Sequence, residues 1–122
     1  MGKFVVKVGK SGGVRFNLVA GNGQIIGSSE IYKSDASCLN GIASVKRCCA
    51  GGIQDTTVED APAVKHPKFE IFQDKAGDYR FRLKARNGEI ILSSEGYKKK
   101  ESCLNGVESV KKNAPDAPIV RE

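Results

Sequence analysis

The chain has 122 residues, of which 39% are hydrophobic and 28% are charged, and its formal net charge is +6 at pH 7. This is the composition of an ordinary globular protein. No apolar run approaches the roughly 20 residues that a membrane helix needs, so the sequence predicts no membrane partner. Residues 1–6 lead directly into an alternating apolar pattern, which leaves no room for a secretory signal. We therefore expect a cytoplasmic protein.

The strongest signal in the sequence is an internal duplication. Residues 4–47 align without a gap on residues 69–112, and 24 of the 44 positions are identical. A unit of about 45 residues is too small to be stable alone without disulfides, a metal or a partner. We therefore predict one domain in which two repeats share a core. Its expected boundaries are 1–122 for the whole, about 3–59 for repeat one, about 60–67 for a linker, and about 68–122 for repeat two.

Within each repeat the apolar residues first alternate as they do in β-strands. In repeat one the alternation runs through residues 4–8 and 14–20. Asn22-Gly23 then predicts a two-residue hairpin of type I′, a turn in which both central residues have positive φ. A strand over residues 24–28 completes an antiparallel meander. Repeat two contains the same steps, so six strands are expected.

After each meander the apolar spacing becomes helical. Apolar residues recur at helical intervals from Cys38 and again from Cys103, which predicts one amphipathic helix per repeat. Ser34 is the expected N-cap of the first helix. Gly41 and Gly106 lie on the buried faces of these helices, where glycine costs about 1 kcal/mol relative to alanine. We expect this cost to be offset by close packing against the sheet or the other helix.

A short segment after each helix completes the expected fold. Residues 55–59 and 118–121 are predicted as short strands that lie at an edge or are exchanged between the repeats. The predicted fold class is therefore α+β, with tandem β(3)-α(-β) repeats that form one antiparallel sheet and two helices packed on one face.

The cysteines and the single histidine give no catalytic or metal-binding pattern. Cys48 and Cys49 have no cysteine counterparts in repeat two, and the chain contains neither a CxxC pair nor a His-Cys cluster. His66 lies beside a proline in the linker, with no neighbour that would orient it as a base. We therefore expect a surface histidine, no metal and no cofactor.

A polar cluster recurs where each third strand leads to its helix. It reads Ser28-Ser29-Glu30-x-Tyr32-Lys33 in repeat one and is repeated over residues 93–98. Loops at such junctions often carry catalysis or ligand binding, but these residue types also satisfy backbone groups at strand ends and helix starts. We favour the structural interpretation, because a duplicated site would be used twice or left idle, and we predict no catalytic residue.

Repeat two differs from repeat one along its middle strand. The middle strand of repeat two has a cation at every second position. Because side chains alternate across a strand, these cations all lie on the face opposite the core. Such a face could bind nucleic-acid phosphates, or it could be a solvated surface whose cations pair with Glu70 or Glu89. Lysines also crowd the start of the following helix. The predicted binding residues, which we name the basic stripe, are Arg80, Arg82, Lys84, Arg86, Lys98, Lys99 and Lys100.

Residues 69–113 carry a longer combined pattern, which recurs more loosely over residues 4–47. It reads Phe-x-Ile, then Gly-x-Tyr-Arg-Phe-x-Leu-x-Ala-x-Asn-Gly-Glu-x-Ile, then Ser-Glu-x-Tyr, and finally Asn-Gly-Val-x-Ser-Val-Lys-Lys-Asn. This pattern resembles the YegP-like family of small, mostly bacterial proteins. The resemblance implies β(3)-α(-β) units in one sheet with exchanged final strands, and it supplies neither an activity nor a site.

The function that these observations favour is a non-enzymatic small binding or interaction domain. We expect a monomer with internal pseudo-two-fold symmetry, whose partner is another protein or a nucleic acid. One alternative is a nucleic-acid-binding protein that uses the basic stripe. The less expected alternative is an enzyme that uses the repeated Ser-Ser-Glu-x-Tyr-Lys cluster.

Overall fold

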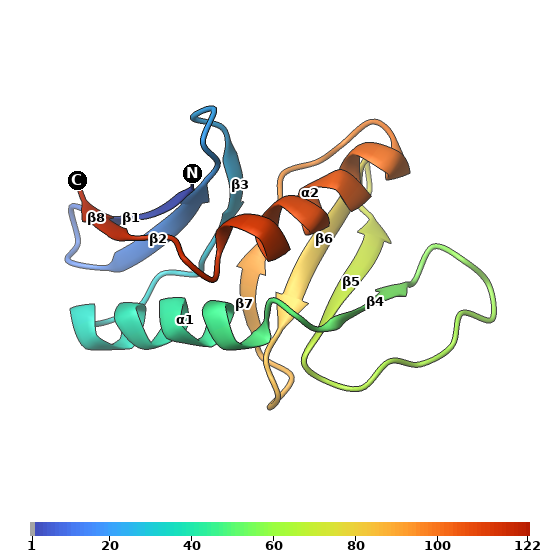
Figure 1. Ribbon diagram of the computed structural model, residues 1–122, viewed down its shortest axis with the longest axis horizontal. Helices are drawn as coiled ribbons and strands as arrows, with labels where there is room; N and C mark the ends of the chain where they lie inside the picture. Colours follow the sequence, from blue (N-terminus) through green and yellow to red (C-terminus); the bar gives the residue numbers. More distant parts are fainter. Residues whose placement is uncertain (1) are drawn as a thin grey trace.

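The computed structural model describes residues 2–122, which contain the element order β-β-β-α-β twice (Figure 1). The duplication in the sequence is therefore a duplication of structure. The elements are β1 (Lys3–Val8), β2 (Val14–Val19), β3 (Ile25–Ser28), α1 (Asp35–Cys48), β4 (Gly52–Asp55), β5 (Lys68–Gln73), β6 (Tyr79–Lys84), β7 (Ile90–Ser93), α2 (Lys100–Asn113) and β8 (Ile119–Arg121).

All the strands belong to a single sheet with the order β4-β5-β6-β7-β3-β2-β1-β8. The two meanders, β1 to β3 and β5 to β7, are antiparallel and meet through one residue pair, Ser28 with Ser93. The final strand of each repeat is exchanged, because β4 pairs with β5 and β8 pairs with β1. This exchange agrees with the family resemblance.

Both exchanged strands pair in parallel with their neighbours, so the sheet is mixed and the prediction of a wholly antiparallel sheet was wrong. Side-chain alternation shows which face a strand buries, but it carries no information about the direction of a neighbour that is distant in the chain. The crossover between the parallel strands β4 and β5 is the segment of residues 56–67, which contains no helix.

The first exchanged strand also lies earlier than predicted, at Gly52–Asp55 instead of residues 55–59. Asp55 ends the strand because its carboxylate Oδ1 accepts the backbone N–H of Thr57, at 2.9 Å, and turns the chain. Thr56 then anchors the turn, since its N–H and hydroxyl both donate to the carbonyl of Ile71.

The hairpins between the second and third strands differ from the predicted type I′ turn. The N–H of Gly23 donates to the carbonyl of Ala20, and Gly23 has a φ of 88°, whereas Asn22 does not have a positive φ. The loop therefore has three residues and one left-handed glycine. Asn22 uses its side-chain oxygen to accept the N–H of Gln24, and Asn87 does the same in repeat two.

The two helices cover the face of the sheet that carries the core phenylalanines. Helix α1 contacts β2 of its own repeat and β6 and β7 of the other, and α2 contacts β6 and β3. In Figure 1, α1 runs from β2 towards β7 and so spans the junction of the halves. One continuous cluster of buried side chains results, and four of its members are the fully buried rings of Phe4, Phe16, Phe69 and Phe81.

The helix glycines pack closely against the sheet, as predicted. A Cβ atom on Gly41 would overlap the phenol of Tyr32. A Cβ atom on Gly106 would lie 2.7 Å from Oη of Tyr97 and 2.8 Å from Cε2 of Phe81. Each glycine therefore makes room for the tyrosine that follows the third strand of its own repeat.

The helix starts differ between the repeats. Ser34 is the N-cap of α1, and its hydroxyl accepts the N–H of Ser37 at 3.1 Å, as predicted. Lys99 takes the same position before α2, and its side chain makes no capping hydrogen bond. Within residues 2–122, neither helix is long and apolar enough to cross a membrane.

Candidate functional site: a basic cleft between the repeats

Two strand cations of the basic stripe are held by a single carboxylate. Oε1 of Glu70 accepts from Nε of Arg82 at 2.9 Å and lies 3.1 Å from Nζ of Lys84, and Oε2 lies 3.5 Å from Nζ of Lys68. The Glu70 side chain is only 9% exposed. Burial by itself raises the pKa of Glu70, but hydrogen bonds from Arg82 and Lys84 outweigh burial and hold the pKa below 4.5.

Other members of the stripe are also paired. Arg80 donates from Nε to Asp74 Oδ2 at 2.7 Å, and this hydrogen bond holds the pKa of Asp74 below 3.8. Lys98 lies 3.3 Å from Asp78, and Lys100 lies 2.9 Å from Asp55. Within residues 2–122, the members of the stripe that form no ion pair are Lys99 and Arg86.

The repeated polar cluster supports the backbone at the junction of sheet and helix. The hydroxyl of Ser29 accepts the N–H of Phe16 at 2.9 Å and donates to the carbonyl of Glu30 at 2.7 Å. In repeat two, Ser94 makes the equivalent two bonds, at 2.9 and 2.8 Å. Burial raises the pKa values of Tyr32 and Tyr97, whose phenols fill the space beside the helix glycines. These bonds favour the structural interpretation of the cluster.

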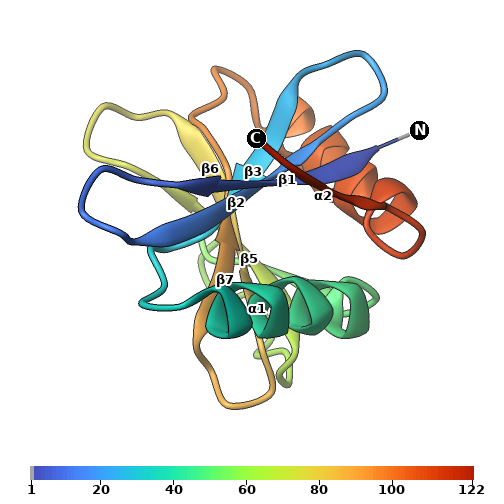
Figure 2. The same ribbon diagram turned by 90° about the vertical axis from the view of Figure 1, so that its left-hand side faces the viewer.

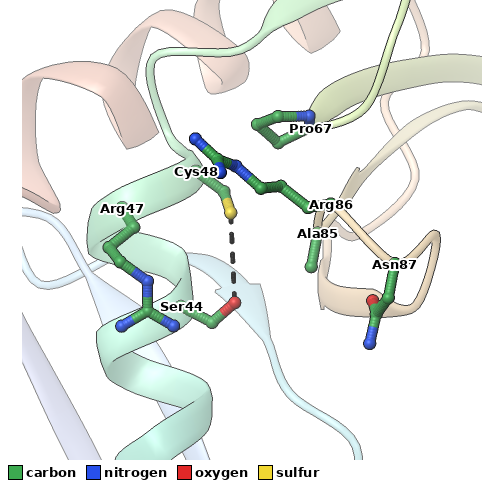
Figure 3. Close-up of a pocket in the computed structure, with 7 residues that line it drawn as sticks. All are labelled: Ser44, Arg47, Cys48, Pro67, Ala85, Arg86 and Asn87. Carbon is green, nitrogen blue, oxygen red and sulfur yellow. Dashed lines mark hydrogen bonds between the residues drawn. The ribbon is translucent and has the colours of Figure 1, made fainter.

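Arg86 lies in a cleft that neither repeat could form alone. The hairpin that follows β6 supplies one wall, the last turn of α1 supplies the other, and the end of the linker closes it (Figure 3). In Figure 3, Arg86 extends from the hairpin towards the end of α1, and Arg47 lies on the helix near Ser44. The volume is about 420 Å³. The lining residues of this basic cleft are Ser44, Arg47, Cys48, Pro67, Ala85, Arg86 and Asn87.

The charge in the basic cleft is not compensated by the protein. Neither Arg47 nor Arg86 forms an ion pair with an acidic side chain in the described part of the chain. Ser44 Oγ lies 3.9 Å from Cys48 Sγ, so the thiol is a weak hydrogen-bond partner for the Ser44 hydroxyl. Two guanidinium groups with free donors can bind an anion through charge-assisted hydrogen bonds.

The equivalent residues of the other repeat line a second cleft with a different charge. The counterpart, of about 690 Å³, lies between α2 and the hairpin after β2. There Gly21 takes the place of Arg86 and Lys112 takes the place of Arg47. Glu108 and Asp116 add two carboxylates to that lining. An excess of positive charge therefore distinguishes the basic cleft from its counterpart.

Arg86 was predicted from the sequence as part of the basic stripe, whereas Arg47 and Ser44 were not predicted. These two residues lie on α1 of the other repeat, about 40 positions earlier in the chain. Helical periodicity does not distinguish them from the other polar residues of that helix. No group of three or more His, Cys, Asp or Glu side chains within residues 2–122 is arranged to hold a metal.

Comparison with known proteins identifies the family. A family model described as a domain of unknown function (DUF1508) matches residues 10–54 and residues 74–120. The two matches correspond to the two repeats and together cover most of the chain. The chain therefore belongs to this family.

Individual relatives support this assignment. A UPF0339 protein of Stutzerimonas stutzeri is 77% identical over 48 residues, which are 39% of this chain and 43% of that protein, so the match spans less than half of that relative. A UPF0339 protein of Agrobacterium fabrum is 64% identical over 53 residues, 43% of this chain and 86% of that protein. The Agrobacterium protein is therefore little longer than one repeat.

A solved structure shows the same fold over the whole chain. The solution NMR structure of yegP from E. coli, described as a protein of unknown function, is 31% identical and has a TM-score of 0.82. The match covers 99% of this chain and 92% of that one. The resemblance to YegP-like proteins is confirmed, and it brings no activity with it.

Proposed function

We propose that the protein is a small non-enzymatic binding domain that holds an anionic ligand in the basic cleft. The observation that carries the proposal is the presence of Arg47 from repeat one and Arg86 from repeat two in one cleft, without a carboxylate among the lining residues. Natural surfaces usually mix the two signs of charge, as the counterpart cleft does with Lys112, Glu108 and Asp116.

A structural role for the two arginines is the competing explanation. A cation at the end of a helix interacts favourably with the helix dipole and often donates to the last carbonyls. Within residues 2–122, however, neither Arg47 nor Arg86 donates a hydrogen bond to a carbonyl of α1. The negative end of the dipole also disfavours an anion, so binding requires both guanidinium groups.

The chemistry of the lining supports binding without catalysis. A hydrolytic or group-transfer site needs a base within hydrogen-bond reach of a nucleophile. The basic cleft is lined by neither an imidazole nor a carboxylate, and the hydroxyl of Ser44 lies beside the thiol of Cys48. The serines of the repeated polar cluster are already bonded to backbone groups.

Nucleic acid remains the alternative partner that the basic stripe suggests. Because Glu70 and Asp74 hold three of the four strand cations, the stripe offers less free charge than the sequence indicates. Phosphate contacts through the stripe would give a log-log salt dependence of affinity, with a slope that falls by about 0.7 to 0.9 for each contact removed. An Arg82→Ala variant tests this directly against Arg15→Ala, which removes an arginine from the middle strand of repeat one.

The test of the proposal is an NMR titration with pyrophosphate at an ionic strength of about 0.1 M. We expect shifts in the backbone amides of residues 44–48 and 85–87 and in the Nε–H groups of Arg47 and Arg86. Arg86→Gly copies the hairpin residue of repeat one, Gly21, and should weaken binding at least about tenfold, since a charge-assisted hydrogen bond contributes about 1.5 to 3 kcal/mol.

The matched control is Lys112→Ala, which removes one positive charge from the counterpart cleft. It should change the pyrophosphate affinity less than about twofold, because exposed charges more than a Debye length of about 10 Å apart are largely screened. Equal losses in Arg86→Gly and Lys112→Ala would show diffuse attraction by a protein of net charge +6 and would refute a specific site.

A further inference from the structure

Large exposed apolar side chains gather on the half of the sheet that contains β1, β2, β3 and β8. The described residues include six such side chains, and five of them lie on these strands or in the adjoining segment 29–34. The sixth, Val58, belongs to the segment after β4. Figure 2 brings β1, β2 and β8 to the front of the molecule. The five are Val8, Ile25, Ile31, Ile119 and Val120.

Two hollows lie on this half of the sheet and share one residue, Lys7. The first has a volume of about 260 Å³ and lies over Val5 and Val19, which are 5% and 9% exposed. The second, of about 220 Å³, lies beside Ile31. We name the combined surface the repeat-one groove, and its defining residues are Val5, Lys7, Arg15, Val19, Ile25 and Ile31.

The fold does not require an apolar surface at these positions. Repeat two has the same meander, but Glu70 stands in place of Val5, Lys84 in place of Val19 and Gly96 in place of Ile31. There the charged side chains form the ion pairs described above. The apolar character of the repeat-one groove is therefore a property of this repeat and not of the architecture.

The charges around the repeat-one groove are predominantly positive. Lys3, Lys7 and Arg15 line the two hollows, and the lining includes one carboxylate, Glu122, which lies 3.2 Å from Nζ of Lys7. Large exposed apolar patches rimmed by polar residues mark interaction sites. An occupant that matches this surface presents apolar side chains to the hollows and acidic side chains to the cations.

We propose that the repeat-one groove binds an extended, acidic segment of a partner protein, one face of which carries apolar and acidic side chains in turn. Every second residue of an extended segment points to the same face, so that face can present apolar residues to the hollows and acidic residues to the cations. β8, the edge of the sheet next to β1, also offers unpaired backbone groups to an added strand. An anionic membrane fits less well, since Val5 and Val19 lie at the bottom of a hollow and the lining contains no aromatic side chain.

Three probes test this proposal on the full chain. The first is a panel of soluble ten-residue peptides in which every second residue is Ser, and the residues between the serines are Glu and Val, Ile or Leu in turn. The second is the same panel with Lys in place of Glu, and the third is vesicles of phosphatidylglycerol. We expect the acidic peptides to bind at least tenfold more tightly than the basic ones, with amide shifts concentrated in β1, β2, β3 and β8.

The informative variant copies repeat two onto repeat one by combining Val5→Glu with Val19→Lys. Because the same side-chain pair is accommodated in β5 and β6, we expect this variant to fold, and it should bind the acidic peptides at least tenfold more weakly. Ile25→Glu, at a site that is 41% exposed, removes an apolar contact and repels an acidic peptide without a change in the buried residues. Pyrophosphate binding at the basic cleft should be unchanged in both variants.

Several results would overturn the proposal. Equal binding of acidic and basic peptides would show that charge complementarity does not determine binding. Unchanged peptide binding in both variants would show that the peptides bind elsewhere on the protein. Vesicle binding without peptide binding would identify a lipid surface. Self-association through the same residues, measured by sedimentation, would make a second copy of this chain the occupant.

Discussion

The close packing of the helix glycines gives a prediction that distinguishes the two repeats. Replacing a helix glycine by alanine normally stabilises a protein by about 1 kcal/mol through helix propensity. At Gly41 the added Cβ overlaps the phenol of Tyr32, whereas the Phe16 ring lies at a milder 3.2 Å. At Gly106 the Cβ lies 2.7 Å from Oη of Tyr97 and also 2.8 Å from the ring of Phe81.

The expected magnitudes follow from which neighbour can move. Overpacking of a core costs about 1 to 3 kcal/mol. Tyr32 is only partly buried, so its ring can shift, and Gly41→Ala should lower the free energy of unfolding by about 0 to 1 kcal/mol after the propensity gain. Phe81 is fully buried and cannot yield in the same way. Gly106→Ala should therefore cost about 1 to 2 kcal/mol.

Double-mutant cycles measured by urea unfolding make the comparison sharp. In a Tyr32→Ala background the obstacle to Gly41→Ala is gone, and the glycine substitution should stabilise by about 1 kcal/mol. In a Tyr97→Ala background the contact with Phe81 remains, so Gly106→Ala should still destabilise. Both comparisons require unchanged m-values, so that a shift in midpoint reports stability.

Stabilisation of the wild-type protein by the full propensity gain in both Gly41→Ala and Gly106→Ala would contradict this prediction. That result would mean that the helices tolerate a Cβ at these positions. Complete rescue of Gly106→Ala by Tyr97→Ala would show that Phe81 is not a barrier.

Two further predictions concern the charge network and the shared core. Glu70→Gln should lower the free energy of unfolding by about 3 kcal/mol, because it leaves Lys68, Arg82 and Lys84 without their common carboxylate. Since the folded-state pKa of Glu70 is below 4.5, its contribution is present above the unfolded pKa and is lost as pH falls through the folded pKa. Urea unfolding of wild type and variant should therefore converge in acid, and parallel pH profiles would contradict this account. The whole chain should unfold in one transition, and residues 68–122 alone should be unfolded or dimeric by sedimentation, whereas a stable monomeric half would rule out a shared core.

The parts of the fold that were predictable from the sequence are those encoded locally. Alternation between Phe4 and Ala20 identified β1 and β2, because each strand buries one face against helices of the same protein. Helical spacing after Ser34 identified α1, and the cost of Gly41 indicated its close approach to the sheet. Because the sequence is duplicated, the same inferences apply to β5, β6 and α2 in repeat two.

The parts that the sequence did not reveal depend on contacts between repeats. Nothing near β4 or β8 specifies that each pairs in parallel with the first strand of the other repeat. Arg47 and Arg86 come together because α1 spans the junction and packs on β6 and β7. Glu70 was named as one possible partner of the stripe, but its contacts with Lys68, Arg82 and Lys84 follow from the register of neighbouring strands.

The exchange of the final strands has a consequence for how this protein can change over time. In an assembly of two identical single repeats, every substitution would appear on both halves at once. Here the segment between β4 and β5 joins the halves covalently, so Val5 and Glu70, or Gly21 and Arg86, can be selected independently. The exchanged strands keep the halves interlocked while they diverge. The chain therefore carries two non-equivalent sheet surfaces and two non-equivalent clefts within one fold.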